Sequence, residues 1–353
     1  MASAATIRRL GLSCLALIAA GAAAAAPPPE ASRRAPVVGV RGDVGCGPDA
    51  KAAQRLLITE PGVYENLLVD GKWVAKNLVK IRADGVTLRR CEIRNGRHNA
   101  VAVYASKVTI DSCRIHHLLA GTFKDQHDAH GITGQATDVV IRNCEIYQVS
   151  GDAVQFDPGR GPWDNVLVEN CTFWIAPLEA DAVGFKKGER PGENAVDTKQ
   201  QESNPRSRMT IRNCLFYGWG DGQIANQAAL NLKDHVQVTV EGCVFRDNDI
   251  CFRLRGDTGE RGGALVTIRD CAVYRSKIAV RMEDRIRDLK MLRLGIGPGI
   301  GRKYTVAGGK PVDLVSEGEY PAPAYEKAVA EGLGSPPDHG VGLRAASGSE
   351  GSR

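Results

Sequence analysis

Aromatic side chains are scarce in this sequence and make up 5% of its 353 residues. An excess of charge of one sign is also lacking, since 46 basic residues face 41 acidic ones and the formal net charge is +5. This balance argues against a dedicated nucleic-acid binder. The hydrophobic fraction of 43% excludes a wholly disordered chain. At this length we expect two domains, or one large repetitive domain.

Beyond the first 26 residues, the sequence also lacks an apolar run long enough to cross a bilayer. Residues 1–26 are typical of a signal peptide: Arg8 and Arg9 precede an apolar stretch at 10–20, and small residues follow it. We therefore expect a secreted or periplasmic protein without a membrane span. Residues 335–353 hold Gly, Ser, Pro and charge without periodicity, which predicts a flexible tail.

What the sequence does contain is a short unit that recurs seven times around a central cysteine. The first copy is Val86-Thr-Leu-Arg-Arg-Cys91-Glu-Ile, and the mean spacing of the cysteines is (271 − 91)/6 = 30 residues. Alternation of apolar and polar residues before each cysteine predicts a strand, and the residue before it is mostly one that tolerates a left-handed bend. A further strand follows after a loop of variable length. The central cysteines are Cys91, Cys113, Cys144, Cys171, Cys214, Cys243 and Cys271.

Three short strands per turn, with equivalent positions stacked, predict an all-β fold. We expect a single-stranded parallel β-helix solenoid over residues 60–290, with three short sheets and a core of small Val, Ile and Cys ladders. Stacked cysteines lie about 4.8 Å apart with parallel side chains, which disfavours disulfides and favours buried free thiols. The state of Cys46 and Cys251, which lie outside the column, stays open.

The ends of a solenoid expose core and strand edges, so both need covering. We expect an N-terminal segment and cap over 27–59, including a short helix within 48–57. A C-terminal cap is expected over 291–334, with a closing helix at 325–331.

Polar residues concentrate on the outward side of the third strand of each unit. Because side chains alternate along a strand, these positions form two columns that run along the solenoid. Mixed charge on consecutive turns favours a functional face, and the alternative is an ordinary solvated face. The first column includes Gln155, Asp197, Asn231 and Arg253, the second includes Asp157, Lys199, Lys233 and Arg255, and His130, Asp152 and Asn194 start neighbouring strands.

The cysteine-centred turns and the three-strand rung resemble the right-handed parallel β-helix of the pectate-lyase superfamily, over roughly residues 60–290. That fold hosts lyases, hydrolases, epimerases and adhesins, so the resemblance implies the fold more than the function. In the lyases, acidic residues on the third-strand sheet bind Ca²⁺, and a Lys or Arg removes the proton α to a uronate carboxylate. Glu193-Asn-Ala-Val-Asp-Thr-Lys199 is similar to the family's Asp-Gly-Phe-Ala-x-Lys strand, with Asn194 in place of its Asp.

The resemblance implies a lyase that cleaves an acidic (uronate) polysaccharide by Ca-assisted β-elimination, with Lys199 as the base. We expect Lys233, on the next turn, to lower the pKa of Lys199 and Asp157 to raise it, so that Ca²⁺ bound at Asp157 would cancel the rise and leave the lowering. Arg253 or Arg255 is expected to hold the enolate or a neighbouring uronate. The expected calcium ligands are Asp157, Asp197, Asp152 and Glu193. The expected substrate-binding residues are His130, Gln155, Asn194, Asn231, Trp163 and Trp219.

Two other functions stay open. A glycoside hydrolase would use Asp157 and Asp197 as paired carboxylates, and a non-catalytic protein would bind surface carbohydrate or act as a scaffold. In each case the partner is a polysaccharide and the protein is expected to be a monomer. The loops at 118–129 and 172–193 are inserted at the same point of the rung, so we expect them to wall a cleft over the third-strand sheet.

Overall fold

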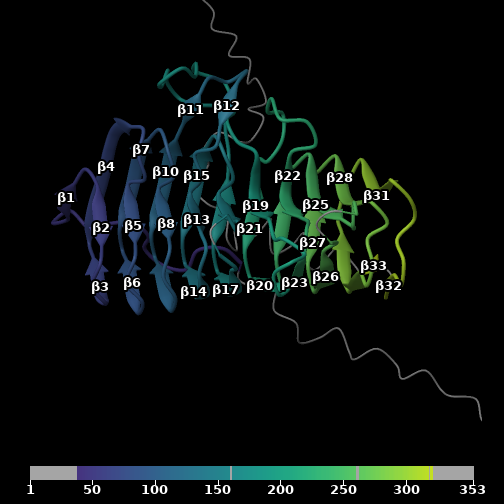
Figure 1. Cartoon of the computed structure of the whole chain (residues 1–353). Coiled ribbons are helices and arrows are strands. Elements are labelled where there is room, and N and C mark those ends of the chain that lie inside the picture. The colour runs from purple at the N-terminus through teal and green to yellow at the C-terminus, as the bar shows by residue number, and fades with distance from the viewer. Residues whose placement is uncertain (1–37, 160, 260–261, 318, 321–353) are drawn as a thin grey trace, which may run out of the picture. The chain divides into compact units, whose positions relative to one another are not determined.

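In the computed structural model, residues 38–159, 161–259, 262–317 and 319–320 are described. Every regular element in these ranges is a strand, and the strands wind turn by turn through three parallel sheets (Figure 1). No helix in these ranges is long and apolar enough to cross a membrane. The expected signal peptide at 1–26, the helix at 325–331 and the tail at 335–353 lie outside the described residues.

The three sheets take one strand each from every turn. Sheet A contains β1 (Lys51–Ala53), β4 (Leu67–Val74), β7 (Glu92–Gly96), β10 (Arg114–Leu118), β15 (Glu145–Val149), β18 (Thr172–Trp174), β21 (Leu215–Tyr217), β24 (Val244–Arg246), β27 (Ala272–Tyr274), β30 (Leu294–Ile296) and β33 (Glu319–Tyr320). Sheet B contains β2 (Leu56–Ile58), β5 (Val79–Ile81), β8 (Val101–Val103), β13 (Ile132–Gly134), β16 (Val154–Phe156), β19 (Asn194–Thr198), β22 (Ala228–Leu232), β25 (Ile250–Arg255), β28 (Ile278–Glu283) and β31 (Arg302–Ala307). Sheet C contains β3 (Gly62–Glu65), β6 (Val86–Arg89), β9 (Val108–Asp111), β14 (Thr137–Arg142), β17 (Asp164–Glu169), β20 (Ser207–Arg212), β23 (Val236–Glu241), β26 (Leu265–Arg269), β29 (Lys290–Leu292) and β32 (Val315–Ser316). A small antiparallel pair, β11 (Ala120–Gly121) and β12 (Gln126–His127), projects from the turn that follows β10.

The bend between sheets C and A is the one predicted from the residue before each cysteine. All seven of these residues have a left-handed backbone, with φ between 49° and 61°. Asn and Asp reach this region at low cost and Gly at none, which explains their prevalence at the bend. The residues are Arg90, Ser112, Asn143, Asn170, Asn213, Gly242 and Asp270.

The predicted cysteine column is buried in the core. Each of the seven side chains is fully buried, and the nine cysteines of the described ranges, Cys46 and Cys251 included, are free thiols. The column is tightly stacked: the backbone N–H of Cys144 donates to Sγ of Cys171 at 3.4 Å, and that of Cys171 to Sγ of Cys214 at 3.4 Å. The core also holds a phenylalanine ladder, in which Phe216 stacks on Phe173 and Phe245.

The solenoid extends beyond the predicted 60–290 range in both directions, from Lys51 to Tyr320. The helix expected within 48–57 is wrong, because β1 and β2 occupy that segment. Lys51 pairs with Leu67 and Leu56 with Val79, so ladder hydrogen bonds to the next turn replace helical ones.

The segment 38–47 lies along the outer face of sheet A. The N–H of Gly39 donates to the carbonyl of Asn213 at 2.8 Å, and the N–H of Gly45 to that of Ser112 at 2.9 Å. Val38 packs in one cluster with Trp174 and Tyr217, which belong to an aromatic ladder on this face. The ladder is thus covered by the chain's own N-terminal segment and stabilises the sheet.

Sheet C carries charges of alternating sign on its outer face. Strand register places eight residues of eight consecutive turns in one column, and neighbours along it form ion pairs, such as Arg89 with Glu65 at 2.7 Å and Arg212 with Glu169 at 2.6 Å. The order along the column is Glu65, Arg89, Asp111, Arg142, Glu169, Arg212, Glu241 and Arg269.

Candidate functional site

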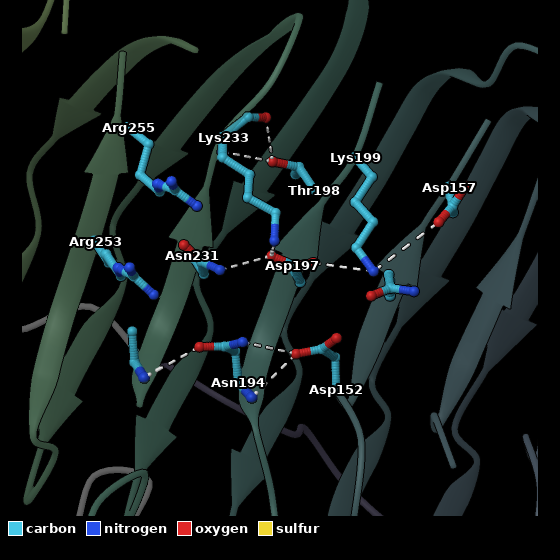
Figure 2. A network of polar contacts seen from close by, with 12 residues as sticks. Asp152, Asp157, Asn194, Asp197, Thr198, Lys199, Asn231, Lys233, Arg253 and Arg255 are labelled. Carbon is cyan, nitrogen blue, oxygen red and sulfur yellow. Dashed lines mark hydrogen bonds and ion pairs between the residues drawn. The ribbon is translucent and has the colours of Figure 1, made fainter. Parts of the chain in front are cut away.

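The polar face predicted from the two columns forms on the outer side of sheet B. Strand register places Gln155, Asp197, Asn231 and Arg253 side by side on β16, β19, β22 and β25, and Figure 2 shows the surrounding contacts. Although they point away from the core, Gln155, Asp197 and Asn231 are only 4%, 2% and 4% exposed. Longer side chains around them therefore exclude most of the solvent.

Asp197 is the centre of this network. Nζ of Lys233 lies 3.0 Å from its Oδ1, and Nδ2 of Asn231 donates to the same oxygen at 2.8 Å. Nζ of Lys199 lies 4.0 Å from its Oδ2 on the other side (Figure 2). Burial raises the pKa of Asp197, and the two ammonium groups oppose this rise.

Lys199 lies between two carboxylates, because its Nζ is also 4.0 Å from Oδ2 of Asp157. Burial acts against its charge, but Asp197, Asp152, Asp128 and Asp157 together raise the pKa of Lys199. The lowered pKa that the sequence predicts with Ca²⁺ at Asp157 is not what the protein by itself shows, since here the carboxylates outweigh burial. Lys233 is paired with Asp197 at 3.0 Å.

A second row of residues, formed by His130, Asp152 and Asn194, lies next to the polar face of sheet B. Asn194 donates to Oδ1 of Asp152 from its backbone N–H at 3.1 Å and from Nδ2 at 2.9 Å. The backbone N–H of Asp152 donates to Nδ1 of His130 at 2.9 Å, and Nε2 of His130 lies 3.1 Å from Nε2 of Gln155. Burial, then Asp197 and Glu193, raise the pKa of Asp152, which is 1% exposed. These residues position the network and offer little surface to a polymer.

The four expected calcium ligands are not gathered around one point. The ammonium of Lys199 lies between Asp157 and Asp197, Asp152 is bonded to Asn194, and burial followed by Asp128 raises the pKa of Glu193. Within the part of the chain that the structure describes, no three His, Cys, Asp or Glu side chains are placed to hold a metal ion. The arrangement does not fit a resident Ca²⁺, since an ammonium already takes the position between the carboxylates.

Trp163 and Trp219 cannot stack on a sugar ring, so this expectation is wrong. Trp163 is 1% exposed and its Nε1 donates to the carbonyl of Lys199 at 2.7 Å, while Trp219 is fully buried and its Nε1 lies 3.3 Å from the carbonyl of Phe173. In a chain with few aromatic residues, these rings fill the corners of the core.

The two inserted loops pack against each other, and the cleft that they are expected to wall stays a prediction. Leu119 from the first loop lies in one buried cluster with Leu178 and Phe185 from the second. Oε1 of Gln126 also accepts a hydrogen bond from the N–H of Gly192 at 2.9 Å. The first loop brings Asp128 towards the site, where its Oδ2 lies 3.7 Å from Nε2 of His130. No periodic signal in the sequence marks Asp128, because it belongs to an insertion.

A small hollow of ≈ 170 Å³ adjoins Lys199 and Asp157. It offers several oxygen and amide groups beside the ammonium, which suits sugar hydroxyl groups. Its lining includes residues that the sequence did not single out, because they follow the ends of β19 and β22. The lining residues are Asp157, Pro158, Lys199, Gln200, Gln201 and Asp234.

Arg253 and Arg255 lie on the side of Asn231 that faces away from Asp197. Both contact the carboxylate of Glu283, at 3.1 and 3.3 Å. Strand register continues the two outward columns by one turn and places Arg281 beside Arg253 and Glu283 beside Arg255. The column pattern alone did not indicate that these four residues form one group.

Comparison with known proteins supports the fold. Residues 77–180 match the family described as "Right handed beta helix region". No curated protein sequence is similar enough to match. Solved structures with a similar chain path include an alginate lyase from Paenibacillus sp. str. FPU-7. It is 14% identical over 72% of this chain and 93% of its own, with a TM-score of 0.45.

Two further structures are similar at the same low level. Pectate lyase Pel9A is 11% identical over 75% of this chain and 67% of its own, with a TM-score of 0.40. Endopolygalacturonase I from Stereum purpureum is 14% identical over 69% of this chain and 70% of its own, with a TM-score of 0.34. Similarity at this level assigns no activity and no residue role. The matched region and the three stacked sheets together show that this chain is a right-handed parallel β-helix protein, as its sequence pattern predicted.

Proposed function

We propose that this protein is an exported carbohydrate-active enzyme that cleaves an acidic, uronate-containing polysaccharide by β-elimination on the outer face of sheet B. The observation that carries the proposal is the arrangement of Lys199 and Lys233 on either side of the buried Asp197. Buried ionisable groups that compete for one partner are typical of catalytic sites, because burial shifts their pKa values. Export rests on residues 1–26, outside the described part.

In the proposed reaction, Lys199 takes the proton from the carbon α to the uronate carboxylate. Its ammonium contacts Asp157 and Asp197 only at 4.0 Å, so the side chain is not locked in a short ion pair and can turn towards a substrate. As the α-proton leaves, a double bond forms to the β-carbon, the β-carbon–oxygen bond breaks, and the leaving oxygen takes a proton from water. Lys233, which lies beside Asp197, supplies positive charge for the carboxylate on which negative charge develops.

The raised pKa of Lys199 predicts an alkaline limb in the pH–rate profile. A lysine acts as a base only when neutral, and its pKa lies above the ordinary 10.5 because four carboxylates outweigh burial. The neutral fraction, and with it kcat, should therefore rise about tenfold per pH unit below that pKa. Absorbance of the unsaturated product, followed from neutral to alkaline pH, measures this. A rate that does not change with pH over this range would show that Lys199 acts only through its charge.

Replacing Asp157 by Asn tests the cause of that limb. The substitution removes one of the carboxylates that favour the charged form of Lys199, so the limb should move to lower pH. Asp138→Asn is a matched control, because Asp138 contacts Asn165 near the N-terminal ends of β14 and β17 on sheet C instead of Lys199. Equal profiles for all three proteins would remove Asp157 from the electrostatics of the site.

Chelation of divalent metals tests whether calcium takes part. Because the ammonium of Lys199 lies between Asp157 and Asp197, we expect activity on a uronate polymer to persist in the presence of a chelator. Activity that disappears with the chelator and returns with added Ca²⁺ would instead support calcium binding at these carboxylates, as the family resemblance implies.

A glycoside hydrolase is the second candidate, because Asp157 and Asp197 lie on opposite sides of Lys199. Their Oδ2 atoms are at most about 8 Å apart, since each is 4.0 Å from the same Nζ. That limit allows the carboxylate separation of a retaining glycosidase or of an inverting one. The products decide between the two enzymes: a hydrolase releases saturated ends, whereas the proposed lyase releases ends that absorb in the ultraviolet. Binding without either product would support the non-catalytic function.

A further inference from the structure

Three arginine side chains converge on one buried carboxylate on the outer face of sheet B. Arg253 and Arg255 lie on β25, Arg281 lies on β28, and all three contact Glu283, which is 6% exposed. Burial opposes the charge of Glu283, but hydrogen bonds from Arg253 and Arg281 hold its pKa below the usual value. Glu283 therefore stays ionised and gathers the three guanidinium groups.

Among the described residues, the positive charge of this group exceeds the negative charge that it contacts. In the described part of the chain, the ion pairs of the three guanidinium groups go to two carboxylates, those of Glu283 and Asp284. Arg255 is held most loosely, at 3.3 and 3.4 Å. The three side chains are still 18%, 30% and 25% exposed, so part of each side chain is open to solvent. A guanidinium binds a planar carboxylate with two parallel hydrogen bonds, which makes such a group suited to an oxyanion.

The place of the group in the fold separates it from the reacting centre. Strand register runs from Asp197 through Asn231 to Arg253, so Arg253 lies two strand spacings, ~9.6 Å, along the axis from the strand of Asp197. Among the described residues, the carboxylates that act on Lys199 from the preceding turns are those of Asp152, Asp128 and Asp157. A second acidic sugar is therefore attracted on the arginine side and repelled on the other.

We propose that Arg253, Arg255 and Arg281, gathered by Glu283, form an anion subsite that binds a second acidic group of the polymer, away from the sugar that reacts at Lys199. This inference rests on the proposed function and adds to it a direction: the acidic polymer extends from Lys199 towards β28. It also gives Arg253 and Arg255 a binding role that does not depend on the transition state.

Calorimetric binding of polygalacturonate and of its carboxyl-reduced, neutral form tests the subsite, in a Lys199→Ala background that prevents turnover. We expect Arg281→Ala to weaken binding of the acidic polymer about tenfold or more, because a hydrogen bond between charged groups is lost, and to leave the neutral polymer unaffected. Arg212→Ala is the matched control, since Arg212 forms a comparable ion pair with Glu169 on sheet C. Equal binding by Arg281→Ala and its parent would overturn the subsite while leaving the lyase proposal intact.

Glu283→Gln separates geometry from general charge. The substitution makes the face more positive, so a purely electrostatic surface would bind the acidic polymer more tightly. The proposed subsite should bind it more weakly, because the three guanidinium groups lose the carboxylate that aligns them. Thermal unfolding of the variant shows whether it is folded. If it is not, the comparison of Arg281→Ala with Arg212→Ala tests the subsite instead. Tighter binding by a folded Glu283→Gln protein, or no binding of any acidic polymer by the parent, would overturn the inference, and the second outcome would also overturn the proposed function.

Discussion

Lys199→Ala is expected to lower kcat on a uronate polymer by roughly 10²–10⁴-fold, the usual contribution of a general base. The side chain reaches outward and lies between Asp157 and Asp197. Its loss should change stability little, because those contacts are long and the side chain is 29% exposed. Initial rates of ultraviolet-absorbing product, with thermal unfolding as a check on the fold, measure both effects.

Two further variants show what Lys199 contributes. Lys199→Arg keeps the charge but resists deprotonation, so it should stay as inactive as the alanine variant. Lys80→Ala removes a lysine from the outer face of sheet B at β5, where it lies over the ring of Tyr104, and should keep full activity. Full activity in Lys199→Ala would refute the mechanism, and recovery in Lys199→Arg would show that only the charge matters.

Phe216→Ala is expected to destabilise the solenoid by about 3–5 kcal/mol, the usual cost of truncating a buried aromatic side chain. Phe216 is fully buried and stacks between Phe173 and Phe245, with ring centroids 5.0 and 4.8 Å apart. A solenoid is stabilised by contacts between neighbouring turns, so the cavity weakens two interfaces at once. Chemical denaturation followed by circular dichroism measures the loss.

Phe123→Ala is the matched control for this loss. Phe123 is only partly buried and packs against a small cluster in the inserted loops instead of the core between the sheets. Its truncation should cost clearly less than that of Phe216. Similar losses for the two variants would mean that the stacked ladder contributes no more than ordinary burial.

The fold was predictable because its information is local and repeated seven times. The residue before each cysteine determines the bend, and apolar alternation determines which side chains point inward. Register along sheet B followed from the same repeat, and so did the neighbours of Asp197. The ends were less predictable: β1 and β2 have no cysteine-centred unit, and their strand pairing outweighs local helix preference.

The electrostatics of the candidate site were less predictable for a different reason. Stacking predicts which residue stands beside Lys199 on the next strand, but not which charges reach it from loops. Asp197 raises the pKa of Lys199 most, and Asp152 from the adjoining row and Asp128 from an inserted loop add to the rise. The burial of Trp163 could not be predicted from the repeat either. Its hydrogen bond to the carbonyl of Lys199 joins a loop to a strand end, and the two do not occupy equivalent positions in the repeat.

The alternating charges on sheet C limit how a chain of this kind can change its length. Deleting or duplicating a single turn would bring two residues of like charge side by side, for example Glu65 and Asp111 if the turn of Arg89 were lost. Like charges directly opposite each other on neighbouring strands are destabilising. Removing or copying two consecutive turns preserves the alternation. By this criterion the unit of insertion and deletion along this solenoid is a pair of turns, although the unit of folding geometry is a single one.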